Sequence, residues 1–234
     1  MNSKLSGALR ALVLSLAALG SVAAGAQEAK GGDDALAVLD AFVRTSRCGE
    51  AVFTQTVMSS PLATKGGPRI RKQEGRFAFC RAGQQFRFDY EPPFEQSIVA
   101  DGETLWMHDK ELNQVTAQKQ AQALAGSPTT VVTTARSIKD LERDFELKAE
   151  EGADSLHWVR ATPKSQDSTL SILRVGLHKG DKGAPPQLVM LDIEDRFGKR
   201  SMLRFESYTS QDKLDAKRFS FTPPKGATVL RPEE

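Results

Sequence analysis

Histidine and cysteine, the residues most often used for metal binding and covalent catalysis, are scarce in this chain. It has three histidines and two cysteines in 234 residues, and His108, His157 and His178 are far apart. No His-Glu-x-x-His or paired-cysteine zinc spacing occurs, and there is no Gly-x-Ser-x-Gly elbow, phosphate-binding glycine loop or dinucleotide fingerprint. These absences argue against zinc enzymes, serine hydrolases and nucleotide-binding enzymes.

The acidic residues do not indicate a catalytic pair either. Residues 33–34 and 150–151 are acidic pairs in polar surroundings. Glycosidase carboxylates can come from anywhere in a β-rich fold, so Asp192, Glu194 and Asp195 keep that hypothesis open. A charged strand and turn is the simpler interpretation of these three. The sequence therefore predicts a protein that is not an enzyme and has no metal or cofactor, with a hydrolase as a distant alternative.

Long apolar runs are missing after the N-terminal region. Lys4 and Arg10 precede or border an apolar run at residues 11–23, which an Ala-Gly-Ala site follows. This pattern predicts a secretory signal peptide, residues 1–26, removed by cleavage after Ala26. The run is too short, and too rich in alanine and glycine, to favour a membrane span. Residues 27–234 are predicted to form one exported, soluble, non-lipidated domain.

An excess of one charge is also missing. Removing Lys4 and Arg10 takes the formal net charge from +2 to 0, which gives no general attraction to nucleic acid or an anionic membrane. Basic residues cluster at Arg69–Lys72, and a solvated strand edge explains them. We therefore expect no nucleic-acid partner, no stable membrane insertion and a monomeric protein.

The two cysteines, Cys48 and Cys80, have a spacing that favours a disulfide. The segments AVFTQTVMSS and RIRKQEGRFAFC predict two strands joined by the turn PLATKGGP. A hairpin centred on that turn places Cys48 opposite Cys80, and Phe53 and Val57 on the same face as Phe77. The cysteines project from the other face. In an oxidising compartment such a bridge adds roughly 3–4 kcal/mol in the chain-entropy model; two buried free thiols are the alternative.

Periodicity predicts an α+β protein dominated by one curved antiparallel sheet of about ten strands. An amphipathic helix is expected over 33–47, and short helical segments over 117–125, 127–136 and 137–145. Asp101-Gly102 predicts a type I′ hairpin turn. Strands are expected near residues 51–60, 69–80, 86–90, 97–100, 103–109, 145–152, 155–164, 169–179, 187–208 with a turn at 196–199, and 218–230.

Alternating aromatic residues make one strand face unusually rich in rings. The stretch FAFCRAGQQFRFDY places Phe77, Phe79, Phe86, Phe88 and Tyr90 at period two on either side of a break. An ordinary sheet core is the simpler interpretation of this pattern. A strongly curved sheet of this width encloses more space than its side chains need fill, so a lined cavity is the second interpretation. Periodicity alone does not separate the two.

An ordered series of motifs resembles the outer-membrane lipoprotein carriers, the LolA family. Residues 86–118, FRFDYEPPFEQSIVADGETLWMHDKELNQVTAQ, are similar to the family's run from F-R-W-x-Y through I-V-S-D-G-x-x-L-W to Q-V-T. The similarity continues with GSPTTVV, ATPK, the Asp-x-Phe-Gly turn and FSFTPPKGATV, and AVFTQTV resembles the family's F-x-Q segment upstream. Together these pieces cover roughly residues 36–230.

The resemblance implies a fold and a function. The fold is an incomplete, half-open β-barrel with a lid of short helices over a hydrophobic cavity. The function is that of a periplasmic chaperone, which binds acylated lipoproteins released by an inner-membrane ABC transporter and delivers them to an outer-membrane acceptor. Two alternatives stay open: a carrier of the same fold for another lipid, and a periplasmic regulator that senses lipoproteins.

The resemblance also suggests site residues. Arg81 falls on the family arginine that bonds lid backbone and holds the empty cavity closed. Ala82 stands where the family usually has proline, one extra residue precedes Phe86, and the cysteine pair is outside the common pattern. The candidate cavity residues on strands are Phe53, Phe77, Phe79, Phe86, Phe88, Tyr90, Ile98, Leu105 and Met107, and those of the lid are Val131 and Val132.

Overall fold

The structure is a computed structural model that describes residues 31–60, 67, 69–124, 135–152, 154–181 and 183–231. The expected signal peptide therefore lies outside the described residues. The elements in chain order are α1 Gly31–Thr45, β1 Cys48–Met58, β2 Ile70–Cys80, β3 Gln85–Tyr90, β4 Gln96–Ala100, β5 Thr104–Asp109, β6 Gln114–Lys119, α2 Gln120–Ala123, α4 Ile138–Asp144, β7 Phe145–Glu150, β8 His157–Pro163, β9 Leu170–His178, β10 Gln187–Asp195, β11 Arg200–Gln211, the 3₁₀ helix η2 Ala216–Phe219 and β12 Thr228–Leu230.

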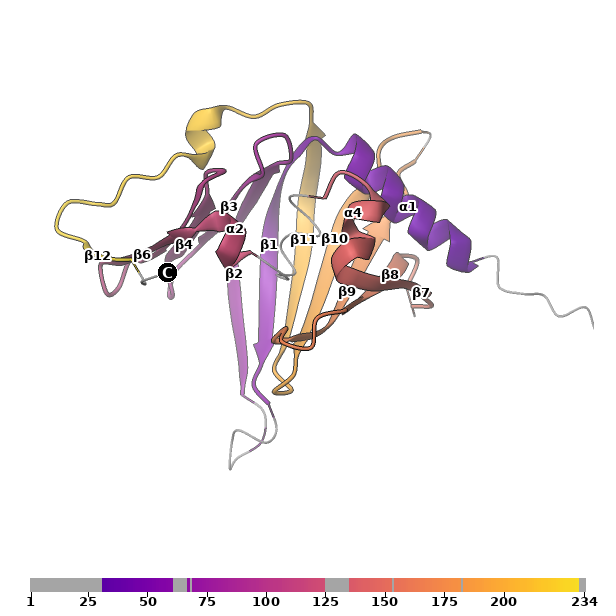
Figure 1. Cartoon of the computed structure of the whole chain (residues 1–234), viewed down its shortest axis with the longest axis horizontal. Helices are drawn as coiled ribbons and strands as arrows, with labels where there is room; N and C mark the ends of the chain where they lie inside the picture. Colours follow the sequence, from indigo (N-terminus) through magenta and orange to yellow (C-terminus); the bar gives the residue numbers. More distant parts are fainter. Residues whose placement is uncertain are drawn as a thin grey trace, which may run out of the picture.

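All twelve strands belong to one curved sheet in the order β12-β6-β5-β4-β3-β2-β1-β11-β10-β9-β8-β7. The eleven strands from β6 to β7 each pair antiparallel with their neighbours in this order, whereas β12 pairs parallel with β6. The sheet is open, because β12 and β7 stand at its two ends, and α1, α2 and α4 lie on its concave side (Figure 1). The predicted α+β class with an incomplete barrel and short helices is confirmed. The predicted sheet of about ten strands, all antiparallel, was wrong in two details, because the described sheet has twelve strands and one of its strand pairs is parallel.

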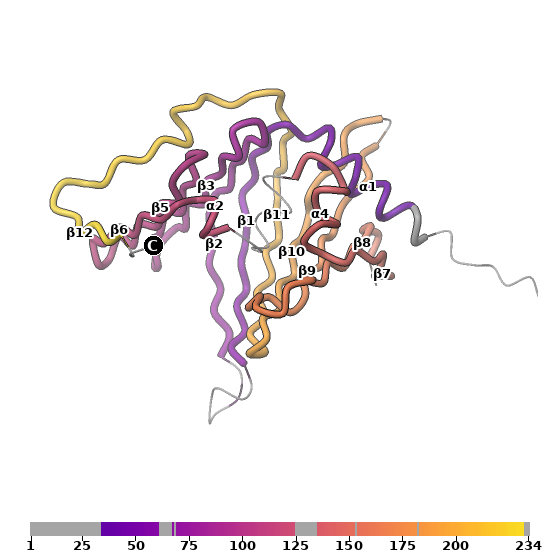
Figure 2. Tube along the Cα trace, viewed as in Figure 1, coloured from indigo at the N-terminus to yellow at the C-terminus, as the bar shows by residue number. Residues whose placement is uncertain are grey.

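The β1–β2 hairpin has the predicted register. Cys48 pairs with Cys80, and Ala51 with Phe77. The two cysteines form the predicted disulfide, with Cα atoms 4.1 Å apart. Buried Ala78 and Phe219 pack around the bridge on the convex face. The long central strands run from this bridge to the β10–β11 connection. We call the strand ends near the bridge the disulfide end, and those near the β10–β11 connection the turn end. The Cα trace in Figure 2 shows both ends of the long central strands.

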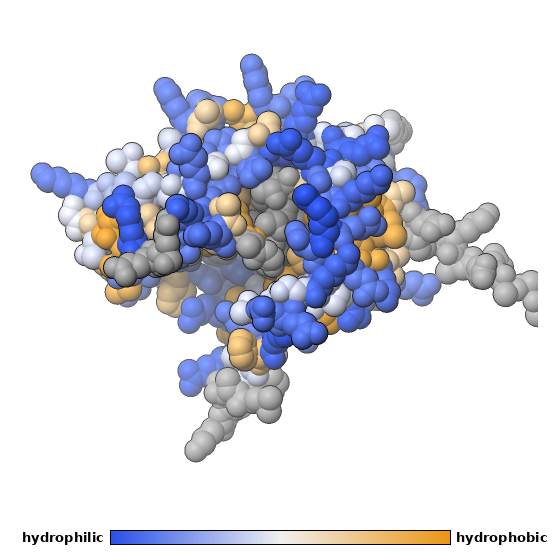
Figure 3. Space-filling model, viewed as in Figure 1, coloured by the Kyte–Doolittle hydropathy of each residue, from blue (hydrophilic) through white to orange (hydrophobic). Residues whose placement is uncertain are grey.

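Helix α1 fills one half of the concave face. Its apolar residues Leu39, Phe42 and Val43 are almost fully buried, as expected for an amphipathic helix that faces a sheet. The Phe42 ring lies 6.5 Å from that of Phe79 and 6.4 Å from that of Tyr208. Hydrophilic side chains cover most of the molecular face seen in Figure 3. The apolar stripe formed by Leu39, Phe42 and Val43 therefore holds α1 against the sheet.

One of the three short helical predictions needs correction. Residues 117–119 belong to strand β6, and only Gln120–Ala123 form a helix, because Thr104 and Leu105 of β5 pair with Lys119 and Gln118 and extend the ladder. The helix expected over 137–145 is confirmed as α4, and Ser137 caps it by accepting a hydrogen bond from the backbone N–H of Asp140. Most of the segment 127–136 lies outside the described residues.

The C-terminal segment is mainly a strap rather than the expected strand over 218–230. After β11 it crosses the convex face through η2, and only Thr228–Leu230 form a strand. Phe219 is buried beside the disulfide, and the Phe221 ring lies 5.5 Å from that of Trp106. Aromatic side chains at period two here anchor an irregular segment, which explains why the strand prediction failed. In the described part of the chain, no helix combines the length and apolarity needed to cross a membrane.

The turn between β4 and β5 differs from the type I′ prediction. The Asp101 N–H donates to the Thr104 carbonyl, so Gly102 and Glu103 are the central residues. Only Gly102 has a positive φ, 109°, as in a type II′ turn. The Asp101 carboxylate accepts hydrogen bonds from the backbone N–H groups of Glu103 and Thr104 and from the Trp106 indole, at 2.8–2.9 Å. These bonds fix the turn one residue later than predicted.

Replacing Asp101 with asparagine is expected to lower the free energy of unfolding at pH 7 by about 1 kcal/mol, a modest value because the carboxylate is partly exposed. Burial favours its neutral form, but the hydrogen bonds from Thr104, Trp106 and Glu103 outweigh burial and lower the pKa of Asp101. Because this pKa is lower in the folded than in the unfolded chain, the ionised carboxylate stabilises the fold above about pH 4. This stabilisation is lost as the pH falls through the folded-state pKa. Urea unfolding should show a smaller difference between variant and wild type at about pH 2.5 than at pH 7; equal differences would contradict this assignment.

Candidate functional site

The half of the concave face that α1 leaves uncovered contains an apolar cavity of about 260 Å³. Strands β3, β4 and β5 supply one wall, β10 and β11 supply the facing wall, and α2 lies at the disulfide end. The alternation of each strand directs every second side chain to this face. The lining residues are Gln55, Phe77, Phe86, Phe88, Tyr90, Ile98, Leu105, Met107, Ala123, Leu124, Leu191, Ile193 and Leu203.

Seven of the nine strand residues proposed from the sequence line this cavity. The two others, Phe53 and Phe79, are buried in its surroundings. The Phe79 ring packs against Phe42 and Phe77, and the Phe53 ring makes edge contacts with Phe88 and Tyr90. The two therefore support the wall. The proposed lid residues Val131 and Val132 lie outside the described residues.

Sequence reasoning missed the wall formed by β10 and β11. In these strands Met190 and Met202 are also apolar, but they pair with Arg204 and Asp192 on the opposite, polar face. The next residues along, Leu191 and Leu203, point into the cavity. Both parities carry apolar side chains in these strands, so alternation alone did not fix which face is inside. In the structure Leu203 pairs with Gln55 of the F-x-Q segment, and this pairing places β11 beside the rest of the cavity wall.

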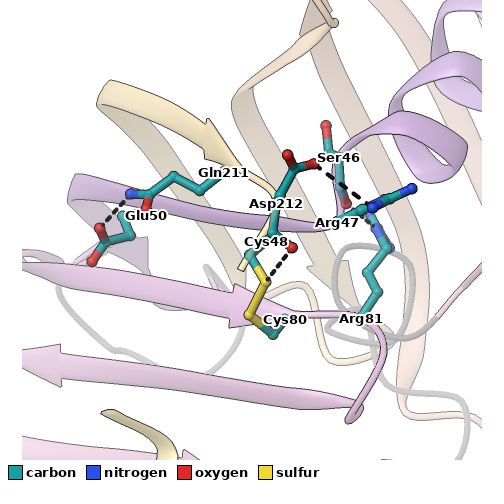
Figure 4. Close-up of a disulfide and its surroundings, with 8 residues drawn as sticks. All are labelled: Ser46, Arg47, Cys48, Glu50, Cys80, Arg81, Gln211 and Asp212. Carbon is teal, nitrogen blue, oxygen red and sulfur yellow. Dashed lines mark hydrogen bonds and ion pairs between the residues drawn. A yellow bond between two sulfur atoms is a disulfide. The ribbon is translucent and has the colours of Figure 1, made fainter. Parts of the chain in front are cut away.

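Arg81 is almost completely buried at the disulfide end, where it joins two segments that are distant in the sequence. Its Nε donates to the Ser46 carbonyl at the end of α1, and its Nη1 donates to the Ala135 carbonyl before α4, both at 2.9 Å. The guanidinium lies over the rings of Phe42 and Phe79, 5.0 and 5.1 Å from their centroids. Figure 4 shows Arg81 beside the disulfide, directed at Ser46.

Burial lowers the pKa of Arg81 to about 10, so the group remains a cation at neutral pH. Within the described residues, its Nη2 has no hydrogen-bond partner. No described carboxylate pairs with this arginine; its charge is held by two carbonyls and two aromatic faces. Such a cation depends on the position of the backbone segments around it. A small displacement at Ala135 breaks one of its two hydrogen bonds.

The acidic residues that had kept a hydrolase hypothesis open have structural partners. The buried Asp192 carboxylate accepts two hydrogen bonds of 2.7 Å from Arg200 and lies 3.5 Å from Arg174. Asp195 accepts the backbone N–H groups that follow it in the β10–β11 turn. Glu194 lies 4.0 Å from Arg174. The charged strand and turn predicted from the sequence is thus observed, and no cluster of three potential metal ligands occurs among the described residues.

A larger hollow of about 640 Å³ lies on the convex face and is polar. Its three arginines have carboxylate partners: Arg87 pairs with Asp89 at 2.6 Å, Arg218 pairs with Glu50, and Arg76 lies 3.5 Å from Glu91. Its arginines are thus paired, and its lining mixes charged side chains with apolar ones such as Ala51 and Val52. The cavity on the concave face remains the candidate site.

Comparison with known proteins agrees with the motifs. The family model described as "Outer membrane lipoprotein carrier protein LolA" matches residues 44–222. This chain belongs to the LolA family. Two proteins named "Outer-membrane lipoprotein carrier protein" are similar to this chain over most of its length. The one from Albidiferax ferrireducens is 42% identical over 200 residues, 86% of this chain and 92% of its own length. The one from Methylibium petroleiphilum is 41% identical over 215 residues, 92% and 96% of the two chains.

The fold of this LolA-family chain also has a structural parallel. An uncharacterized conserved protein from Thermus thermophilus matches with a TM-score of 0.50 at 15% identity, over 85% of this chain and 99% of its own. Similarity at this identity supports the fold alone. The family resemblance inferred from the motifs at residues 86–118 is confirmed by the family match and the two relatives.

Proposed function

We propose that this protein is a periplasmic carrier that binds the acyl chains of lipoproteins released from an inner-membrane ABC transporter and delivers them to an outer-membrane acceptor. The observation that carries the proposal is the apolar cavity on the concave face, in a chain whose relatives are named as lipoprotein carriers. Eleven of the thirteen lining side chains have no polar group. The proposed carrier is the single domain of residues 27–234, without enzymatic activity.

The physics of transport supports a shielded cavity. Each buried CH₂ group contributes about 0.8 kcal/mol, so one long acyl chain exposed to water costs on the order of 10 kcal/mol. A lipoprotein cannot cross an aqueous compartment with such chains exposed. The proposed contact surface is the strand set Phe77, Phe86, Phe88, Tyr90, Ile98, Leu105 and Met107, supported by Phe53 and Phe79.

The cavity has to widen for this task. Its volume of about 260 Å³ is below the roughly 300–1,000 Å³ of pockets that enclose drug-sized ligands. We propose that Arg81 holds this narrow form closed, since its bonds to Ser46 and Ala135 link the two helix-bearing segments on the concave side. Loading would break the bond to Ala135, and its return would favour release of the cargo.

Native mass spectrometry of the protein purified from periplasm tests the proposal. We expect a fraction of the protein to carry bound, acylated lipoprotein, which an excess of purified outer-membrane acceptor removes. Bound lipid of another class would instead indicate a carrier of the same fold for that lipid. Protein that stays empty and hydrolyses a test ester would contradict the carrier function.

A further inference from the structure

Two polar side chains, Gln55 and Tyr90, line a cavity whose other lining residues are apolar. Both side chains are half-buried, so water reaches their polar groups when the cavity is empty. A ligand that fills the cavity displaces this water, so it needs polar groups of its own to replace the lost hydrogen bonds.

Gln55 keeps part of its amide unpaired. Its Nε2 donates to Ser201 Oγ at 2.7 Å, which uses one of its two N–H groups. Among the described residues, nothing donates to Gln55 Oε1, and the second N–H has no acceptor. The bond to Ser201 fixes the amide group between β1 and β11. The amide is thus positioned while one donor and one acceptor stay available.

Tyr90 presents a hydroxyl in the same region. Its ring lies 5.2 Å from the ring of Phe53 and stacks 6.5 Å from that of Phe88. Within the described part of the chain, no group forms a hydrogen bond with the hydroxyl. Burial raises the pKa of Tyr90 to about 12, so the hydroxyl remains protonated and can donate. The aromatic contacts hold the ring, as the bond to Ser201 holds Gln55.

Both groups lie toward the turn end of the cavity. Gly75 of β2 pairs with Phe53 on one side and with Tyr90 on the other, and Gln55 follows two residues after Phe53. Along β2 the disulfide end is buried, whereas residues 70–72 at the turn end are exposed. The opposite end of the cavity is apolar, with Phe86, Leu105 and Leu124. The cavity therefore has an apolar closed end and a polar end next to solvent.

We propose that Gln55 and Tyr90 bind the ester and amide groups that join acyl chains to the cargo. The inference deepens the proposed carrier function and rests on it. The tails then point to Phe86 and Leu105, and the cargo polypeptide leaves at the turn end. The Tyr90 hydroxyl and the free N–H of Gln55 donate to acyl carbonyls, and Gln55 Oε1 accepts from an amide N–H.

This arrangement gives the cavity a preference that hydrocarbon alone does not provide. A site built to hydrogen-bond a ligand discriminates against an analogue that lacks the partner, because its own polar groups are then unpaired. The apolar wall, by contrast, recognises chain length only. The expected difference between two ligands that differ by one carbonyl is about fivefold in Kd for each hydrogen bond.

Two synthetic peptides test the inference. One carries a palmitoyl ester on a serine, and the other carries a hexadecyl ether on the same serine, so the chains have equal length and differ by the carbonyl oxygen. Their Kd values are measured by displacement of a fluorescent apolar dye from the full mature protein. Wild type should bind the ester about fivefold or more tightly than the ether.

Three single variants and one double variant separate recognition from structure. Tyr90→Phe removes only the hydroxyl, and Gln55→Met replaces the amide by a side chain of similar length; each should reduce the ester preference, and the double variant should abolish it. Met107→Ala serves as the control and should weaken both peptides alike. Circular dichroism checks that all variants are folded.

The outcomes distinguish the inference from the proposed function. If wild type binds both peptides equally, or if the double variant keeps the preference, the inference is wrong and the carrier function stands. If wild type binds neither peptide, the carrier function fails, and the inference fails with it. A preference lost in the variants, with ether binding retained, supports both.

Discussion

The Arg81→Leu variant is expected to take up acylated peptide but to pass its lipoprotein cargo to the outer-membrane acceptor more than tenfold more slowly than wild type. The leucine side chain has no donors, so the carbonyls of Ser46 and Ala135, now bonded at 2.9 Å, lose their partners in the closed form. An unpaired buried carbonyl costs about 1–3 kcal/mol. The closed form therefore loses about 2 kcal/mol relative to the open form, or roughly thirtyfold in the equilibrium.

The charge of Arg81 moderates this effect. Burying the guanidinium is itself unfavourable, which is why the pKa of Arg81 falls to about 10, and leucine removes that cost. The net loss of stability is thus smaller than the sum of two charge-assisted hydrogen bonds would suggest. We expect the free energy of unfolding to fall by about 2 kcal/mol, which leaves the protein folded.

Time courses of cargo transfer to purified acceptor measure the effect. Arg81→Lys should be intermediate, because an ammonium keeps the charge but does not span both carbonyls as the guanidinium fork does. Arg47→Leu is the matched control: its side chain is exposed, and its ion pair with Asp212 is 3.8 Å long, so it should change stability by less than about 1 kcal/mol and leave transfer unchanged. Normal transfer by Arg81→Leu would remove the closing role.

The hairpin and its disulfide were predictable from the sequence because two independent constraints agree there. The turn PLATKGGP sets the register, and alternation puts Phe53 and Phe77 on one face and the cysteines on the other. A register slip by one residue would have exposed every ring. Strongly alternating strands with a defined turn thus leave little freedom, and the structure has the predicted pairs.

The cavity itself was less predictable. Alternation located the wall formed by β3, β4 and β5, but a filled core and a lined cavity have the same pattern. The missing information was which half of the concave face α1 covers, and this depends on packing between Phe42 and Phe79, not on local sequence. The facing wall was missed at Leu191 and Leu203 because their neighbours Met190 and Met202 are also apolar. Family motifs, not periodicity, favoured the cavity.

The Cys48→Ala/Cys80→Ala double variant is expected to lose about 3–4 kcal/mol of unfolding free energy, which corresponds to a fall in Tm of roughly 10 °C for a domain of this size. The bridge joins residues 32 positions apart, and opening it releases that loop in the unfolded chain. Phe219 and Ala78, which are packed around the bridge, also lose contacts. Thermal unfolding followed by circular dichroism measures the change.

Reduction provides the control for this prediction. Dithiothreitol should lower the Tm of wild type by about the same amount, and it should leave the Tm of the double variant unchanged. A wild-type Tm that does not respond to reduction, together with an unchanged Tm for the double variant, would show that the bridge contributes nothing. A fall in the variant alone would instead assign the loss to packing around Phe219.

The disulfide also bears on the proposed closing role of Arg81, because it fixes one side of that contact. Cys80 directly precedes Arg81, the Arg81 N–H donates to the Arg47 carbonyl at 2.9 Å, and its Nε donates to Ser46. These three attachments surround the bridge (Figure 4), so only the bond to Ala135 is free to break when the cavity opens. At a temperature well below its Tm, the cysteine double variant should therefore transfer cargo within about threefold of the wild-type rate, whereas Arg81→Leu should not. Equal defects in the two variants would place the moving part at the disulfide itself rather than at Ala135.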